Sequence, residues 1–108
     1  MAALLLAANA LASLALANAN PVNSASEACT LVKARYSARH HLPTSRIGFC
    51  DMVPAADSPR GFYVLTLHST RRCDYICSSW LGSFAVEGSS GLVFEWNTGE
   101  WELGPEVG

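Results

Sequence analysis

The sequence predicts an α+β fold in which one N-terminal helix packs on a four- to five-stranded antiparallel sheet, giving two layers stapled by disulfides. Three observations predict it. A helical period begins near residue 24, a period of two replaces it after residue 46, and four cysteines are present. A chain of 108 residues is long enough for one domain with a modest core. Disulfides are the usual supplement to a core of that size.

The first nineteen residues are predicted to be an export signal. They are uncharged, mostly apolar and close with Ala17-Asn18-Ala19, an Ala-x-Ala cleavage pattern. No basic residue opens the run, which departs from the usual form of an export signal. A retained membrane anchor is the alternative, although the run is shorter than the roughly 20 apolar residues that span a bilayer and is broken by Asn9, Ser13 and Asn18. We expect a single domain over residues 20–108, ordered over 24–103, in a periplasmic or secreted protein with no transmembrane segment in its mature form.

The helix is expected to begin at Ser24 and to end near His40, after a frayed leader. Ser24-Ala-Ser-Glu27 has the form of a capping box. Leu42-Pro43 ends the helix, because a residue before proline is disfavoured in the α region. On a 3.6-residue period, one face collects the residues predicted to be buried, namely Ala25, Ala28, Cys29, Val32 and Tyr36.

The later part of the chain has the alternation and the β-branched and aromatic residues of strands. A glycine- and serine-rich turn over residues 88–91 predicts a tight hairpin. Trp101 and Leu103 are expected to form a short fifth strand or an extended tail, with a loose end from residue 104. The four main strands are predicted over residues 46–53, 62–68, 83–87 and 92–96.

The four cysteines are predicted to form structural disulfides, with Cys29–Cys50 and Cys73–Cys77 preferred and the crossed pairings left open. The first pair would tie the helix to the first strand, and the second would close a tight loop. A thiol–disulfide function of Cys73 and Cys77 is the alternative, but their spacing is not Cys-x-x-Cys. No cofactor is expected, and no metal, because the three histidines do not stand at zinc-ligand spacing from the cysteines.

The order of elements resembles that of small secreted bacterial PepSY and cystatin-like domains. The resemblance is carried by a helix, a strand, Tyr63-Val-Leu-Thr-Leu67, and then Phe84-Ala-Val-Glu87 with a glycine turn into Gly91-Leu-Val-Phe94. It covers most of residues 24–96. It implies a binding or protease-inhibiting role rather than catalysis.

Charge is unevenly distributed although the net charge is −2. All seven Lys and Arg lie between Lys33 and Arg72, and glutamates are frequent after residue 87. A basic strip could meet an anionic envelope surface or an acidic partner, or it could be the solvated face of the helix. Nucleic acid is not an expected partner, since the total charge is acidic and no recognition motif is present. The strip consists of Lys33, Arg35, Arg39, His40, His41 and Arg46.

Three tryptophans, Trp80, Trp96 and Trp101, are further candidates for a partner site, because a sheet covered by one helix leaves its other face partly open. Catalysis is not predicted, because no nucleophile is placed beside His40-His41 and no serine lies in a Gly-x-Ser-x-Gly elbow. The sequence thus predicts a non-catalytic binding module of the cell envelope or the exterior, an inhibitor or immunity-type protein. The alternatives are a structural protein attached to an anionic surface and a thiol–disulfide protein.

Overall fold

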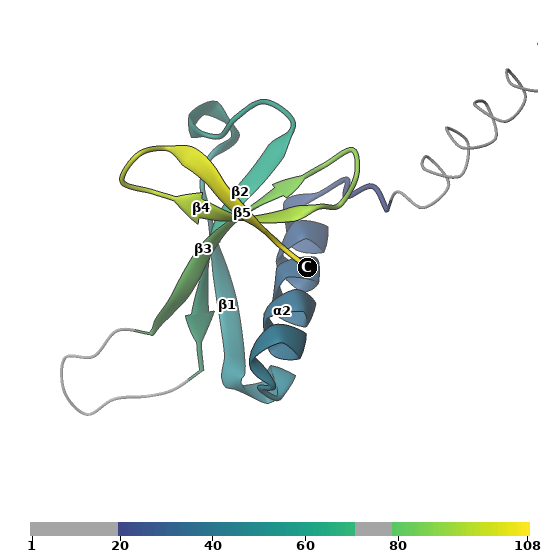
Figure 1. The fold of residues 1–108 in the computed structure, drawn as a ribbon, viewed down its shortest axis with the longest axis vertical. Coiled ribbons are helices and arrows are strands. Elements are labelled where there is room, and N and C mark those ends of the chain that lie inside the picture. The colour runs from purple at the N-terminus through teal and green to yellow at the C-terminus, as the bar shows by residue number, and fades with distance from the viewer. Residues whose placement is uncertain (1–19, 71–78) are drawn as a thin grey trace, which may run out of the picture.

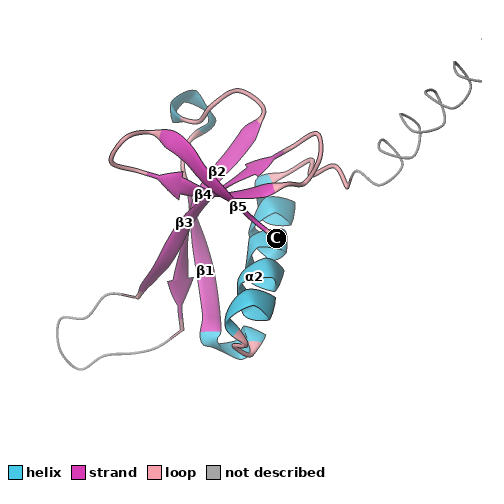
Figure 2. Cartoon of the chain, in the orientation of Figure 1, coloured by secondary structure: helices cyan, strands magenta, loops and turns pink. Residues whose placement is uncertain are grey.

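The computed structural model, which describes residues 20–70 and 79–108, confirms one helix packed on a five-stranded antiparallel sheet (Figures 1 and 2). The strands lie in chain order, each paired with the next. The helix covers one face of the sheet, the helix face, and the opposite face is called the open face. The elements are α2 (Ala25–His40), η1 (Thr44–Arg46), β1 (Ile47–Met52), η2 (Ala55–Asp57), β2 (Phe62–Ser69), β3 (Trp80–Glu87), β4 (Val93–Asn97) and β5 (Glu102–Val107).

Helix α2 begins and ends where the local sequence signals predict. The Ser24 hydroxyl accepts the Glu27 N–H at 3.1 Å, and the Glu27 carboxylate accepts the Asn23 N–H at 2.9 Å. In the usual capping box this carboxylate accepts the N–H of the cap residue, and here it accepts that of the residue before the cap. At the other end His41 takes a left-handed conformation with φ 52°, and its N–H donates to the Ser37 carbonyl. This geometry ends the helix just before the proline-containing exit loop.

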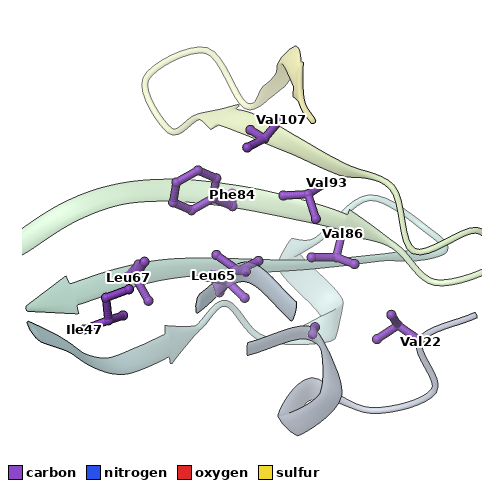
Figure 3. Close-up of a cluster of buried hydrophobic side chains, with 10 residues drawn as sticks. Val22, Ile47, Leu65, Leu67, Phe84, Val86, Val93 and Val107 are labelled. Carbon is purple, nitrogen blue, oxygen red and sulfur yellow. The ribbon is translucent and has the colours of Figure 1, made fainter. Parts of the chain in front are cut away.

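The core fills the space between α2 and the helix face (Figure 3). Ala28 and Val32 are fully buried, and Tyr36 is partly buried against them. Ala25, which was predicted to be buried, is exposed because the contact between α2 and the sheet begins one turn later. The strands supply alternate residues to this core, as a period of two requires. The principal ones are Ile47, Leu65, Leu67, Phe84, Val86 and Val93.

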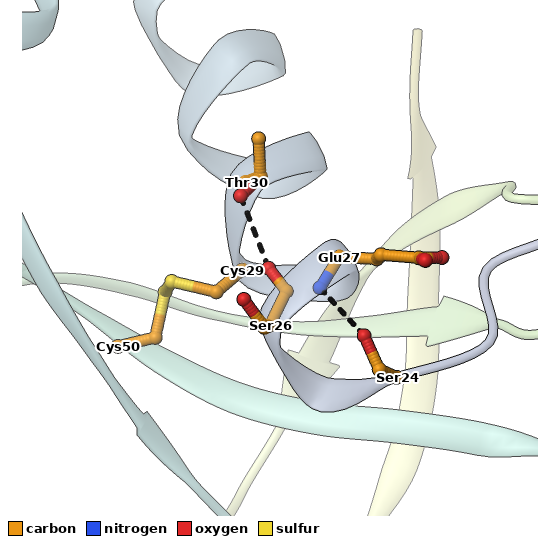
Figure 4. Close-up of a disulfide and its surroundings, with 6 residues drawn as sticks. All are labelled: Ser24, Ser26, Glu27, Cys29, Thr30 and Cys50. Carbon is orange, nitrogen blue, oxygen red and sulfur yellow. Dashed lines mark hydrogen bonds between the residues drawn. A yellow bond between two sulfur atoms is a disulfide. The ribbon is translucent and has the colours of Figure 1, made fainter.

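The predicted disulfide between Cys29 and Cys50 is present, with 6.0 Å between the Cα atoms (Figure 4). Cys50 lies opposite Leu67 in the β1–β2 ladder, and Leu67 belongs to the helix-face core. The side chain of Cys50 therefore points toward α2, as that of Leu67 does. The bridge joins α2 to β1 across 21 positions of sequence. The predicted Cys73–Cys77 pair lies outside the described residues.

Both ends of the domain are packed, which corrects the predictions of a frayed leader and a loose tail. The Asn20 N–H donates to the Ser90 carbonyl at 3.2 Å, and the Val22 N–H donates to the Gly88 carbonyl at 2.8 Å. Val22 is 7% exposed and Val107, near the end of β5, is 4% exposed. Each valine buries an apolar side chain at a margin of the core, which holds its segment in place.

Strand β3 is longer than the sequence predicted, whereas β1, β2 and β4 agree with prediction to within one residue at each end. It begins at Trp80 rather than at residue 83, because its ladder with β2 continues through Ser83 and Gly82 to a pairing of Trp80 with His68. A bulge at Leu81 interrupts this ladder. The extension brings Trp80 into the sheet.

Candidate functional site

The ladder between β3 and β4 is much shorter than the ladder between β3 and β2. Strand β2 pairs with β3 from Phe62 to His68, whereas β4 pairs with β3 only over Phe84, Ala85 and Val86. In Figure 1, β4 runs across the direction of β1 and α2. Among the described strands, Gly82 and Ser83 of β3 therefore pair with β2 alone.

A cavity of about 320 Å³ lies at this position, between the C-terminal end of α2, the first half of β3 and β4. We call it the helix–strand groove. Five consecutive residues of β3 line it, and successive side chains of a strand point to opposite faces, so the groove follows the edge of β3 rather than one face. Its lining residues are Tyr36, Arg39, His40, Trp80, Leu81, Gly82, Ser83, Phe84, Glu95, Trp96 and Val107.

Aromatic rings form the helix-side wall of the groove. The ring of Tyr36 meets that of Phe84 edge-on at 6.2 Å between centroids, and meets the His40 ring at 4.2 Å. A Cβ on Gly82 would come within 3.0 Å of the Phe84 ring. Glycine at that position thus leaves room for the ring to lie along β3. The wall is apolar but ends in an imidazole that can accept or donate a hydrogen bond.

The two long walls of the groove carry opposite charge. Arg39 stands on the α2 side and is exposed, and Glu95 stands on the β4 side and is also exposed. Within the part of the chain that the structure describes, neither side chain makes an ion pair. Both charges are therefore available to groups that enter the groove.

The structure brings together four of the residues predicted to bind a partner. Arg39 and His40 of the basic strip, together with Trp80 and Trp96, line the groove. The bulge at Leu81 sets Trp80 opposite His68, and bulges commonly re-aim side chains next to binding sites. The other predicted residues stand apart from the groove. These are the exposed Arg35, His41, Arg46 and Trp101 and the half-buried Lys33.

Trp96 and Trp101 also pack on the open face, with ring centroids 6.1 Å apart in an edge-on contact. Trp96 is only 6% exposed and forms a small second core with Val64 and Ala85, whereas Trp101 is 58% exposed. The indole N–H of Trp96 is buried with no hydrogen-bond partner among the described residues. This pair therefore places one buried and one exposed tryptophan side by side.

A second cavity, of about 440 Å³, lies between the start of β2 and the turn that follows β3. It is lined by turn and strand-end residues around Gly61 and Gly88, with Arg60 and Glu87 as its charged groups. The Glu87 carboxylate already accepts a hydrogen bond from Ser90. None of the residues predicted to bind a partner lines this cavity, so it is the weaker candidate.

One cluster was missed by sequence reasoning. His68 places Nε2 2.9 Å from Oδ2 of Asp51 and Nδ1 2.9 Å from Oγ of Ser79, while the ring of Phe49 stacks on it at 4.7 Å. The three polar residues come from distant parts of the chain, and the only local signal is that His68 continues the polar alternation of β2.

The arrangement around His68 has the composition of a catalytic triad but not its geometry. The contact between His68 and Asp51 is not aligned as a hydrogen bond, and Asp51 is 67% exposed. In an acyl-transfer triad the carboxylate is buried and aligned with the ring N–H. The cluster is therefore best described as a polar tie between β1, β2 and the start of β3.

No group of His, Cys, Asp and Glu residues that could hold a metal ion occurs in the described parts of the chain. None of the helices described there is long and apolar enough to span a membrane. In comparisons with known proteins, the chain matches no family model, no curated protein and no solved structure.

Proposed function

We propose that this chain is a non-catalytic recognition module that binds another protein, in the cell envelope or outside the cell, through the helix–strand groove. The observation that carries the proposal is the convergence of Arg39, His40, Trp80 and Trp96 on one cavity. Aromatic and arginine side chains are the residue types that dominate binding energy in protein interfaces. A groove of about 320 Å³ is at the lower end of the range for specific sites.

The setting of the proposed function is export. The uncharged apolar run that closes with Ala17-Asn18-Ala19 supports cleavage and export, and the Cys29–Cys50 bridge is of the kind that persists in oxidising compartments. One helix on an antiparallel sheet is also the arrangement that the resemblance to PepSY and cystatin-like domains implies. We therefore favour an inhibitor or immunity-type protein that acts by occupying part of its partner.

The proposal is tested with two matched pairs of variants. Trp80 and Trp101 are 56% and 58% exposed, but only Trp80 lines the groove. Arg39 and Arg35 are both exposed on α2, one turn apart, and only Arg39 lines the groove. The exported, oxidised protein is screened against a displayed library of random peptides, and the Kd of an enriched synthetic peptide is measured by fluorescence anisotropy.

Trp80→Ala and Arg39→Glu are expected to weaken binding by about tenfold or more, whereas Trp101→Ala and Arg35→Glu change it by less than about threefold. Binding should persist at salt concentrations that screen surface charge, whereas attachment of the basic strip to an anionic surface would be lost there. Equal effects within each pair, or no enriched peptide, would show that the groove is not the recognition site.

A further inference from the structure

We propose that the segment bound in the groove is an extended strand of the partner, which pairs with β3 where β4 has departed and directs an acidic side chain at Arg39. This assignment rests on the function proposed above and names the chemistry of the partner at that same site. It follows from three features of the groove. The edge of β3 has no partner in β4 there, the helix-side wall is aromatic, and the two long walls carry opposite charges.

The backbone of β3 is oriented to accept another strand. The Glu87 N–H donates to the Leu92 carbonyl on the β4 side, and the Gly88 N–H donates to the Gly61 carbonyl on the β2 side. Alternate residues of a regular strand face opposite neighbours, and the β2–β3 ladder is regular as far as Gly82. The main-chain groups of Ala85 and Ser83 therefore face the β4 side, as those of Glu87 do, and the bulge at Leu81 ends this alternation. Among the described strands, residues 81–83 have no paired residue in β4. A strand edge of this kind is a template for main-chain hydrogen bonds with a second chain.

The walls beside that edge suit the alternating side chains of an added strand. Side chains that point to the helix face would meet the rings of Tyr36 and Phe84. Those that point to the open face would lie toward Trp96. In this mode of recognition, main-chain bonds supply affinity and pockets for alternate side chains supply specificity. The cavity therefore favours a large apolar residue on the helix-face side of the bound strand.

The opposite charges of Arg39 and Glu95 determine which charged residue of the bound strand is favoured at each wall. An Asp or Glu near the α2 wall would be attracted by Arg39, whose guanidinium has no ion-pair partner among the described residues. The same residue near the β4 wall would be repelled by Glu95. A basic residue would have the opposite preference. The acidic side chain is thus assigned to the α2 side of the groove.

A second copy of this chain is a poor source for that strand. Its outer strands are β1 and β5, and each carries a feature that opposes pairing. The β1 ladder is irregular between Ile47 and Cys50, and β5 contains Pro105, which cannot donate a main-chain hydrogen bond. The strand is therefore expected from a different protein.

The test uses the enriched peptide from the library screen in a series of N-methylated forms, each lacking one amide donor. Strand addition predicts that binding falls by about tenfold or more at every second position and is little changed at the positions between. Amide exchange at Ser83 should slow when the peptide binds, while exchange at Leu103 serves as a control.

Two outcomes would overturn strand addition and leave the proposed function intact. One is a peptide that needs Trp80 and Arg39 but tolerates N-methylation throughout. The other is a peptide sensitive at three- to four-residue spacing, which indicates a bound helix. Loss of dependence on the groove residues themselves would instead overturn the proposed function.

The acidic side chain is tested by charge exchange. Against Arg39→Glu, a peptide whose Asp or Glu is replaced by Lys should bind about tenfold better than the original peptide, reversing the preference of the unmodified protein. No reversal would refute the assignment of the acidic residue to Arg39. Sedimentation of the protein alone should show a monomer, and a dimer that Trp80→Ala dissociates would refute a foreign strand as the occupant.

Discussion

Removing the Cys29–Cys50 disulfide is expected to cost a large part of the stability of the domain. The bridge closes a loop of 21 positions. In the chain-entropy model that loop gives about 11 cal/mol/K, or about 3.3 kcal/mol at 25 °C. Domains of this size are stable by only about 5–15 kcal/mol, and each kcal/mol moves their Tm by roughly 4–8 °C. We therefore expect Tm to fall by about 15–25 °C.

The assay is thermal and urea unfolding followed by circular dichroism, in a background with Cys73→Ser and Cys77→Ser so that one bridge alone is tested. The oxidised form, the reduced form and the Cys29→Ala, Cys50→Ala double variant are compared. Reduction keeps the half-buried side chains and removes only the cross-link, so it isolates the entropic contribution. A reduced form within about 1 kcal/mol of the oxidised one would refute the loop-closure reasoning.

Three further changes should have distinct effects on unfolding free energy, each measured by urea denaturation. Leu65→Ala, at a position with no exposed surface, should cost about 2–5 kcal/mol with an unchanged m-value, and a smaller loss would show that the core collapses around the cavity. Gly91→Ala should cost about 1–3 kcal/mol and more than Gly61→Ala. Both glycines have positive φ, but only at Gly91 would a Cβ collide with the Asn20 carbonyl oxygen; equal losses would contradict that contact. Ser24→Ala should cost about 1 kcal/mol and Ser24→Asn much less, and equal losses would show that the cap is not the cause.

Local sequence signals predicted the helix and one disulfide correctly because their causes lie close together in the chain. The Ser24 hydroxyl and the Glu27 amide are three residues apart, and Pro43 acts on the residue before it. The Cys29–Cys50 pairing followed from placing one cysteine on the buried helix face and the other in the next strand. These inferences needed periodicity and little tertiary information.

The errors concern contacts between distant segments. Nothing local shows that Val22 would pack beside the turn after β3, or that Val107 would reach the core from the end of the chain. The start of β3 at Trp80 depends on its partner His68 in β2. Such positions are fixed by the pairing of whole strands, which a pattern of single residues does not contain.

The candidate site was predictable in its residue types but not in its shape. Arginine, histidine and tryptophan were singled out from the sequence as candidate recognition residues, yet the sequence offered no way to separate Trp80 from Trp101 or Arg39 from Arg35, of which only Trp80 and Arg39 line the cavity. Whether one of these side chains lines the cavity depends on the point where β4 leaves β3, after only three paired residues. That departure is a property of sheet twist and strand order, and it decides which side chains share a cavity.

The distribution of irregularities among the strand edges supports a recognition role for the groove. Exposed edges promote unwanted association, and this sheet protects its two outer ones with an irregular ladder at Ile47 and a proline at position 105. The edge at residues 81–83 is inside the fold, with α2 on one side and β4 on the other. The same fold thus opposes self-association at its outer strands and leaves one inner strand edge bordered by a cavity, where we propose that the partner strand binds.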